Sequence, residues 1–353
     1  MSTFTLYYPG LLGPDVPLEE LGGAEWPDTS QTENLCKLLT SASSKNIQPL
    51  TKTSIEAQIL GCLGLSLPAG AELPIAYYRA INHEINEQSI LCLDPVHIQI
   101  DRDEAVLVAN ESLDILKDDA LQVINDLNQH FQQDGLAIHY HNEHQWLMTG
   151  DISIDTFSMS DVMFQNMNEY QATGRDAKKW RSIINEVQML LHEHPVNIRR
   201  EQQGSIAVNS LWVWGGGQPE QHSTKIDLVY ANDVLVADIA RAIKIDCEAV
   251  PDRLDSNVLR DHETLLILTE QMYAVRQNDV FAWFDYLHLL DKEVIRPLID
   301  MLKNDVIEDF VIVSDTVSIK ITKHDLKNKF WQFWKKTSSL EGCMKSLRKQ
   351  YVY

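Results

Sequence analysis

The feature of this sequence that most restricts its fold is an alternation of strand-like and helix-like apolar runs in its second half. Strands are expected at Leu265–Leu268, Val280–Phe284 and Phe310–Val313, and helices at about Asp233–Ile243 and Lys292–Asn304. Such alternation is typical of an α/β protein in which helices cover a sheet. With 353 residues, the chain has the length of about two ordinary domains.

The first half of the chain predicts an irregular start and a smaller α+β unit. A short strand at Phe4–Tyr8 precedes Pro- and Gly-rich sequence, a helix that begins near Ser54, and a strand at Ile75–Ile81. Residues 90–149 predict two hairpins on either side of a helix at about Asp114–Phe131. Because this arrangement forms a self-contained layer, we expect it to be an inserted domain.

The charge of the chain limits the partners it can bind. It has 30 Lys and Arg against 51 Asp and Glu, a net charge of −21, which disfavours broad contact with nucleic acid. Residues 321–353 are the exception, with eight basic and two acidic residues, a net of +6. This tail either neutralises its own acidic body or docks on an acidic partner or nucleic acid. It is expected to form a helix at about Asp325–Trp334 that packs Phe330, Trp331 and Trp334 on the body; base stacking or membrane contact is the alternative.

Cysteine spacing and hydropathy predict a cytoplasmic protein. No apolar run approaches the roughly 20 residues needed to cross a bilayer, and the N-terminal sequence lacks the basic residues of a secretory signal. The cysteines are odd in number and scattered, so they predict neither a disulfide framework nor a zinc site. They are Cys36, Cys62, Cys92, Cys247 and Cys343.

The segment Leu190–Gly217 holds the strongest candidates for a binding site. A helix at Asp176–His194 is predicted to stop at Pro195, and a loop with two arginines, an apolar strand and three glycines follow. Arginine beside amide groups suits phosphate or carboxylate, so we expect a guanidinium there to face a cleft. The alternative is a packing corner in which the arginines pair with local acids. The expected ligand-binding residues are His194, Asn197, Arg199, Arg200, Asn209, Trp212, Trp214, Gly215, Gly216 and Gly217.

A histidine-rich hairpin is the second candidate for chemistry. His139, His141 and His144 have a spacing that could bind zinc, or they could form a solvated hairpin edge. No Cys or Asp is placed to complete the site, so no bound metal is expected.

The segment 192–217 resembles a stretch of archaeal-type cofactor-independent phosphoglycerate mutases. The mutase stretch has the pattern HPVN-x-x-R…G…N-x-[IL]-W-x-x-G-x-G, and the sequence here is HEHPVNIRREQQG…VNSLWVWGGG. Together with a DPVH motif at Asp94, Pro95 and His97, it resembles more closely a bacterial family of RpfE-type regulatory proteins. The resemblance implies an α/β, alkaline-phosphatase-like core formed by residues 1–95 and 206–353. It also implies that residues 96–205 are inserted as an α+β lid.

The sequence departs from the mutases at their metal site, which holds two divalent ions beside a serine nucleophile. The Asp-Gly pair that follows the first strand in mutases is replaced by Tyr7-Tyr8-Pro9-Gly10, and the late Asp-His motif is at best Val313–Thr316, without histidine. Ser54 lies near the position of the nucleophile, and Asp285 and His288 lie near another ligand position at the wrong spacing.

We therefore expect no catalytic residues, no metal and no cofactor on a degenerate mutase scaffold. The resulting hypothesis is a regulatory or interaction protein that binds a small phosphorylated metabolite or a protein partner. The alternative is an active mutase or phosphatase with a divergent metal site. Nucleic acid is expected only at the basic C-terminal tail.

Overall fold

The structure is a computed structural model. It describes residues 2–14, 29–42, 46–51, 53–65, 67–68, 70–83, 85, 89–101, 104–109, 113–220, 223–328, 342, 344 and 347–349. The chain divides into two compact units: unit 1 combines Met1–Leu65 with His222–Tyr353, and unit 2 is the continuous segment Ser66–Gln221.

The division differs from the boundaries expected after residues 95 and 205. Strand β3 (Ile90–Asp101) runs through the first expected boundary, and strand β7 (Ser210–Trp214) lies beyond the second. These two strands pair with each other, so both belong to unit 2.

Unit 1 is built on a seven-stranded sheet in the order β2-β12-β11-β1-β10-β8-β9. Strands β9, β8, β10, β1 and β11 are parallel, whereas β12 is antiparallel to β11 and β2 is antiparallel to β12. The strands are β1 (Ser2–Tyr7), β2 (Ile47–Pro49), β8 (Leu228–Tyr230), β9 (Asp246–Glu248), β10 (Thr264–Ile267), β11 (Ile307–Val313) and β12 (Val317–Thr322).

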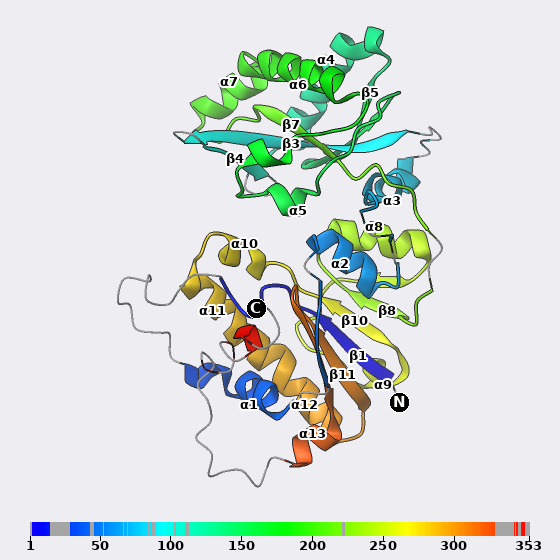
Figure 1. The fold of residues 1–353 in the computed structure, drawn as a ribbon, viewed down its shortest axis with the longest axis vertical. Helices are drawn as coiled ribbons and strands as arrows, with labels where there is room; N and C mark the ends of the chain where they lie inside the picture. Colours follow the sequence, from blue (N-terminus) through cyan, green and yellow to red (C-terminus); the bar gives the residue numbers. More distant parts are fainter. Residues whose placement is uncertain are drawn as a thin grey trace. The chain divides into compact units, whose positions relative to one another are not determined.

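Helices cover both faces of this sheet (Figure 1). On one face, the side chains of Phe4 and Leu6 in β1 join a core with Leu35, Trp283 and Leu298, which come from α1, α11 and α12. Helices α2 and α8 lie on the other side. The α-helices of unit 1 are α1 (Glu33–Ser41), α2 (Ile55–Cys62), α8 (Val234–Ile243), α9 (Ser256–Asp261), α10 (Gln271–Arg276), α11 (Val280–Leu289), α12 (Arg296–Lys303) and α13 (Lys323–Asn328). A 3-10 turn η2 (Thr29–Thr32) precedes α1, and a π-helical segment η8 (Leu290–Ile295) joins α11 to α12.

Unit 2 is built on a five-stranded antiparallel sheet centred on β3. Cys92 pairs with both Leu147 and Trp214, which places β6 and β7 on opposite sides of β3. In the same way, Val96 pairs with a residue of β4 and one of β7, so β7 alone lies on its side of β3. The other strands are β4 (Glu104–Ala109), β5 (Ala137–Asn142) and β6 (Gln145–Thr149).

Helices α4, α6 and α7 lie along one face of the unit 2 sheet (Figure 1). Val123 and Leu127 of α4 and Val187 of α6 share a buried core with Leu93 and Leu211 of the strands. The helices of unit 2 are α3 (Ile75–Ala80), α4 (Lys117–Phe131), α5 (Met159–Val162), α6 (Ala177–His192) and α7 (Pro195–Gln202), with 3-10 turns η4 (Ile81–His83), η6 (Gln132–Asp134) and η7 (Met167–Tyr170).

The architecture confirms the predicted α/β fold class and corrects two of the predicted elements. The segments Ile75–Ile81 and Val280–Phe284, expected as strands, form α3 with the start of η4, and the first half of α11. At α11 the reason is local: the side chain of Asp279 accepts a hydrogen bond from the Ala282 N–H (3.0 Å) and caps the helix.

Part of the C-terminal segment packs on unit 1. Met344 and Leu347 are buried in its core, and the Arg348 guanidinium donates to the carbonyls of Leu12, Gly13 and Pro14 at 2.6–2.9 Å. The aromatic residues Phe330, Trp331 and Trp334, on which the expected terminal helix depended, lie outside the described residues.

Candidate functional site

The segment with the strongest sequence signal forms the end of α6, all of α7, and β7. Asn197, Arg199 and Arg200 therefore lie on a helix, and the expectation of a loop was wrong. Pro195 ends α6 and also occupies the first turn of α7, where its missing N–H costs nothing. His194 caps α7, because its Nδ1 accepts from the Val196 N–H at 3.2 Å.

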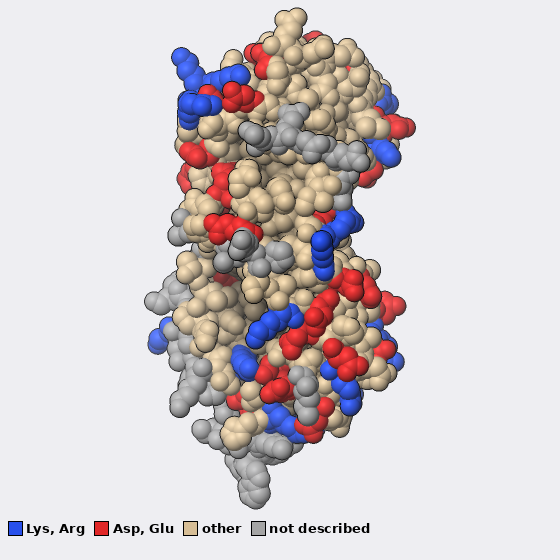
Figure 2. Space-filling model, turned by 90° about the vertical axis from the view of Figure 1, so that its right-hand side faces the viewer, with Lys and Arg blue, Asp and Glu red and all other residues tan. Residues whose placement is uncertain are grey.

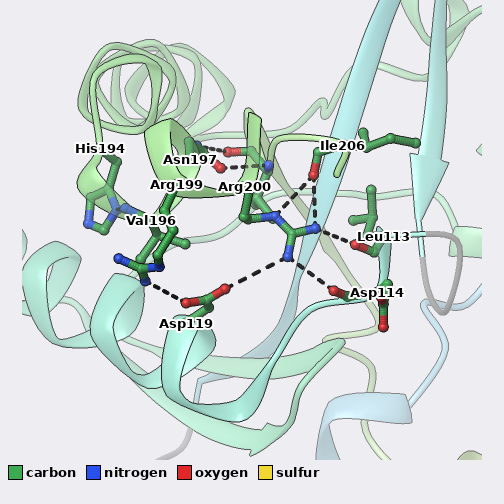
Figure 3. Close-up of polar contacts among 10 residues, drawn as sticks. Leu113, Asp114, Asp119, His194, Val196, Asn197, Arg199, Arg200 and Ile206 are labelled. Atoms are coloured by element: carbon green, nitrogen blue, oxygen red, sulfur yellow. Dashed lines mark hydrogen bonds and ion pairs between the residues drawn. The ribbon is translucent and has the colours of Figure 1, made fainter. Parts of the chain in front are cut away.

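Arg200 is 2% exposed, and its guanidinium is surrounded by backbone carbonyls (Figure 3). Its Nε and Nη2 donate to the Ile206 carbonyl (3.0 and 2.8 Å), its Nη1 donates to Asp114 (3.1 Å), and its Nη2 also donates to Leu113. Burial lowers the pKa of Arg200, and the nearby Asp119 carboxylate, at 3.9 Å, opposes that shift. The side chain thus joins α7 to two backbone segments, one at Leu113 and Asp114 and the other at Ile206.

Arg199 is also engaged inside unit 2. Its Nη2 lies 2.6 Å from Oδ1 of Asp119, whose own side chain is buried at the start of α4. The expectation that a guanidinium of Arg199 or Arg200 faces a cleft rather than a carboxylate is therefore wrong. The physical reason is that α7 packs beside the start of α4. The first turn of α4 supplies the Asp119 carboxylate, and the chain just before that helix supplies the carbonyls of Leu113 and Asp114.

The two asparagines of the segment hydrogen-bond to backbone. Asn197 donates to the carbonyls of Leu191 and Val208 (2.8 and 2.7 Å) and accepts from the Val208 N–H (2.9 Å). Asn209 accepts from the Ile98 N–H (2.7 Å) and donates to the Ile98 carbonyl (3.0 Å). Both donors of the Asn197 amide are thus used in joining β7 to its surroundings.

The DPVH motif lies on β3, directly beside β7, so the two sequence blocks that carry the resemblance pair with each other. Asp94 forms a buried ion pair with Arg79 (2.7 Å) and accepts from the Trp214 indole N–H (2.8 Å). Pro95 lies opposite Leu211 in the strand pairing, and Nδ1 of His97 lies 2.8 Å from the Ala207 carbonyl oxygen.

The three glycines allow close approach of backbone. A Cβ on Gly217 would lie 1.9 Å from the Glu72 carbonyl oxygen, and one on Gly216 would lie 2.3 Å from the Leu91 side chain. Gly215 has φ +72°, a left-handed conformation that favours glycine. The Trp212 indole N–H donates to the Phe157 carbonyl. Each residue of the expected set thus has a structural contact or constraint, and ligand binding by the set stays a prediction.

In unit 1, the carboxyl edge of the parallel strands is the expected place for a ligand. Strands β10 and β11 lie on opposite sides of β1, and α/β sheets bind ligands at such a switch point. Here the turn after β1 is held by side chains: Oδ1 of Asp315 accepts from the Gly10 N–H (2.8 Å) and the Ser314 hydroxyl (2.7 Å). The Gln271 amide donates to Pro9 (2.6 Å), and the Trp283 indole donates to Gly10 (3.0 Å).

The residues at this edge do not fit the metal pair that the mutase resemblance implies. Tyr8 follows β1 instead of a carboxylate, and burial raises the pKa of its hydroxyl. Ser54 acts as the N-cap of α2, accepting from the Ala57 N–H at 3.2 Å, and Nδ1 of His288 lies 3.1 Å from the Gln31 carbonyl. Among the described residues, no group of three or more His, Cys, Asp or Glu is arranged to hold a metal ion.

The histidines of the β5–β6 hairpin contact separate partners. Nδ1 of His141 lies 2.8 Å from Nε2 of His83, whereas Nε2 of His139 lies 3.1 Å from the Thr149 hydroxyl. The His144 N–H donates to the Asn142 side chain. The arrangement does not bring His139, His141 and His144 together around one position.

The surface and the helices add two general observations. On the face that Figure 2 draws, acidic and basic side chains are interspersed over unit 1.

None of the helices in the described part of the chain has the length and apolar character that crossing a bilayer requires.

Comparison with known proteins shows a fold shared with a solved structure and local sequence similarity to phosphoglycerate mutases. No family model matches the chain. The fold is shared with the PH0037 protein of Pyrococcus horikoshii, with a TM-score of 0.56, 15% sequence identity, and coverage of 91% of this chain and 87% of that one.

The mutase relationship comes from local sequence similarity. The chain is 29% identical over 87 residues to a 2,3-bisphosphoglycerate-independent phosphoglycerate mutase of Methanosarcina acetivorans, covering 24% of this chain and 22% of that protein. It is 37% identical over 57 residues to the corresponding mutase of Methanothrix thermoacetophila, covering 16% and 14%. The matched segments therefore span less than a quarter of either relative.

Proposed function

We propose that this protein is a non-catalytic regulatory or interaction protein built on a phosphoglycerate-mutase-like scaffold. The observation that carries the proposal is that side-chain hydrogen bonds hold the turn after β1 in place. Asp315 and Gln271 bind the backbone of Gly10 and Pro9 at the edge where an α/β enzyme would bind its substrate.

The chemistry of the mutase reaction explains why this turn matters. Phosphoryl transfer depends on cations that neutralise the charge of the transition state. The Asp315 carboxylate, which contacts the β1 turn, is instead a hydrogen-bond acceptor for the turn itself. Ser54, the candidate nucleophile, is 9% exposed and its hydroxyl caps a helix.

The resemblance to RpfE-type regulatory proteins supports the regulatory part of the proposal. The partner would be another protein or a small phosphorylated metabolite, and the cytoplasm would be its location. The buried Asp94–Arg79 pair and the carbonyl contacts of Arg200 support a structural use of the motif residues.

Metal analysis with activity assays on the purified full chain tests the proposal. The chain is dialysed with manganese, its metal content is measured, and turnover is assayed with 3-phosphoglycerate and with p-nitrophenyl phosphate. We expect no stoichiometric metal pair, and no turnover above that of a Ser54→Ala variant.

A matched Ser182→Ala variant, at an exposed position of α6, serves as the control. Two bound metals with manganese-dependent turnover, lost in Ser54→Ala and kept in Ser182→Ala, would overturn the proposal. That result would establish the alternative, an active mutase or phosphatase with a divergent metal site.

A further inference from the structure

Unit 2 contains a pocket of about 250 Å³ that includes Trp212 of the expected set but none of its arginines, asparagines or glycines. It lies at β7, the strand that stands alone on its side of β3, and its walls are α6 and the segment 156–172. The volume is close to the lower end of the roughly 300–1,000 Å³ usual for small-molecule sites, which limits the occupant to a small ligand.

One wall of the pocket is aromatic. The rings of Phe157 and Tyr170 meet edge to face, with centroids 5.3 Å apart and planes at 89°. The Trp212 indole is fixed beside them, because its N–H donates to the Phe157 carbonyl at 3.1 Å. Phe157 is nevertheless 37% exposed, so part of an aromatic surface remains open to a planar ring.

Helix α6 contributes three polar side chains to the lining, besides Trp180 and Ile184. Arg181, Asn185 and Gln188 are spaced i, i+4, i+7, which aligns their side chains along the helix. Gln188 donates to the hydroxyl of Ser210 at 3.1 Å, and this contact orients its amide. Neither Arg181 nor Asn185 makes a side-chain hydrogen bond or ion pair with any residue that the structure describes.

The charge of the pocket is unusual for this chain. Arg181 is the charged residue of the lining, and none of the lining residues is acidic. Elsewhere in unit 2 the arginines Arg79, Arg175 and Arg199 are each paired with an aspartate, as the net charge of −21 favours. An anionic group that reaches this pocket would therefore meet a guanidinium with no carboxylate to displace.

We infer that this pocket binds a small planar heteroaromatic ligand that carries a negative charge, the chemistry of a nucleoside monophosphate. The ring would stack on Phe157 and Trp212, its hydrogen-bonding edge would meet the amides of Asn185 and Gln188, and its anionic group would meet Arg181. The inference does not rest on the proposed function, because it uses no residue of unit 1 and requires no turnover.

Calorimetric titration of the full chain with three probes tests the inference: adenosine 5′-monophosphate, adenosine and inorganic phosphate. We expect the monophosphate to bind more tightly than adenosine, and phosphate alone to bind most weakly. Replacing Arg181→Gln should weaken binding of the monophosphate about tenfold and leave adenosine unchanged, because only the charged contact is lost. Asn185→Leu should weaken both the monophosphate and adenosine.

Lys179→Gln is the matched control, since it removes one positive charge from the same helix at a position outside the pocket lining. It should leave all affinities unchanged. The inference is overturned if none of the probes binds at millimolar concentration, if phosphate binds as tightly as the monophosphate, or if Lys179→Gln weakens binding as much as Arg181→Gln. None of these results bears on the metal and turnover test of the proposed function.

Discussion

At the scale of single residues, Arg200 shows how a side chain suited to binding anions is used to join backbone segments. Its donors meet the carbonyls of Leu113, Asp114 and Ile206, which belong to segments far apart in the sequence. A lysine could not replace it, because the planar guanidinium presents donors in several fixed directions at once.

We therefore predict that Arg200→Ala destabilises the protein by about 3 kcal/mol or more, because it leaves the carbonyls of Leu113, Asp114 and Ile206 without their buried donor. Arg199→Ala, whose side chain is 46% exposed, should cost less than about 1 kcal/mol. Urea unfolding of both variants measures the two costs. Equal and small losses would show that Arg200 is not the structural anchor that its contacts indicate.

Asp291 predicts a pH dependence of stability. It is 4% exposed and accepts hydrogen bonds from Asn34 (2.9 Å) and from the Leu35 N–H, and burial raises its pKa above the usual value. The native state therefore keeps the proton at pH values where the unfolded chain, with a pKa of about 3.9, has lost it. Its contribution to stability is present at low pH and is lost as the pH rises through the native pKa.

The measurement compares the wild type with Asp291→Asn, which cannot ionise. The free energy of unfolding of the wild type, minus that of the variant, should fall as the pH rises above the pKa of about 3.9 that the unfolded chain has. A difference that is flat or that rises over this range would contradict the assigned shift.

At the scale of elements, the sequence predicted long periodic segments well and short apolar runs poorly. The α6 helix and the β3–β4 and β5–β6 hairpins lie where their patterns indicated. Short runs rich in aromatic and branched residues fit a strand and a buried helix equally, so α3 and α11 were missed. The capping residue Asp279 was the signal that could have identified α11.

The candidate sites were harder to predict because they depend on contacts between distant segments. Residue types identified Arg199 and Arg200 as anion binders, yet Asp119 and the Leu113 carbonyl, about 80 positions earlier, decide what they contact. Only the β7 part of the unit 2 pocket lies in a block that the sequence analysis singled out. Phe157 and Arg181 are brought together only because α6 packs against β7 and against the segment 156–172.

Two glycines provide a test of backbone packing in these elements. Gly61 lies inside α2 with no atom within 4 Å of an added Cβ, so Gly61→Ala should stabilise the protein by about 0.5–1 kcal/mol. At Gly217 the added Cβ would meet backbone at 1.9 Å, and Gly217→Ala should cost about 1–3 kcal/mol. Thermal melting of the two variants should shift in opposite directions; shifts of the same sign would contradict this assignment.

At the scale of the whole molecule, the two units differ in how the chain builds them. Unit 2 uses one continuous segment and has its own core, which includes Trp146 and Trp180. Unit 1 needs sequence from both sides of that segment, because β1 from the first part pairs with β10 and β11 from the second.

We predict that the fragment of residues 66–221 folds alone, whereas residues 222–353 without residues 1–65 do not, because their sheet lacks its central strand. Circular dichroism and amide hydrogen exchange of the two fragments measure this. A fragment of residues 66–221 without a cooperative unfolding transition, or a stable fragment of residues 222–353, would contradict the prediction.

The position of β1 also has a consequence for the order of events on the ribosome. Thr3 pairs with Asp309 and Phe4 with Thr264, so β1 waits for partners that are synthesised only after the whole of unit 2. All strands of unit 2 emerge in the interval and can fold while β1, with its apolar Phe4 and Leu6, is still without neighbours. The nascent chain thus carries an unpaired strand through the synthesis of unit 2, and we expect the closure of unit 1, which needs this long-range pairing, to be slower than the folding of unit 2.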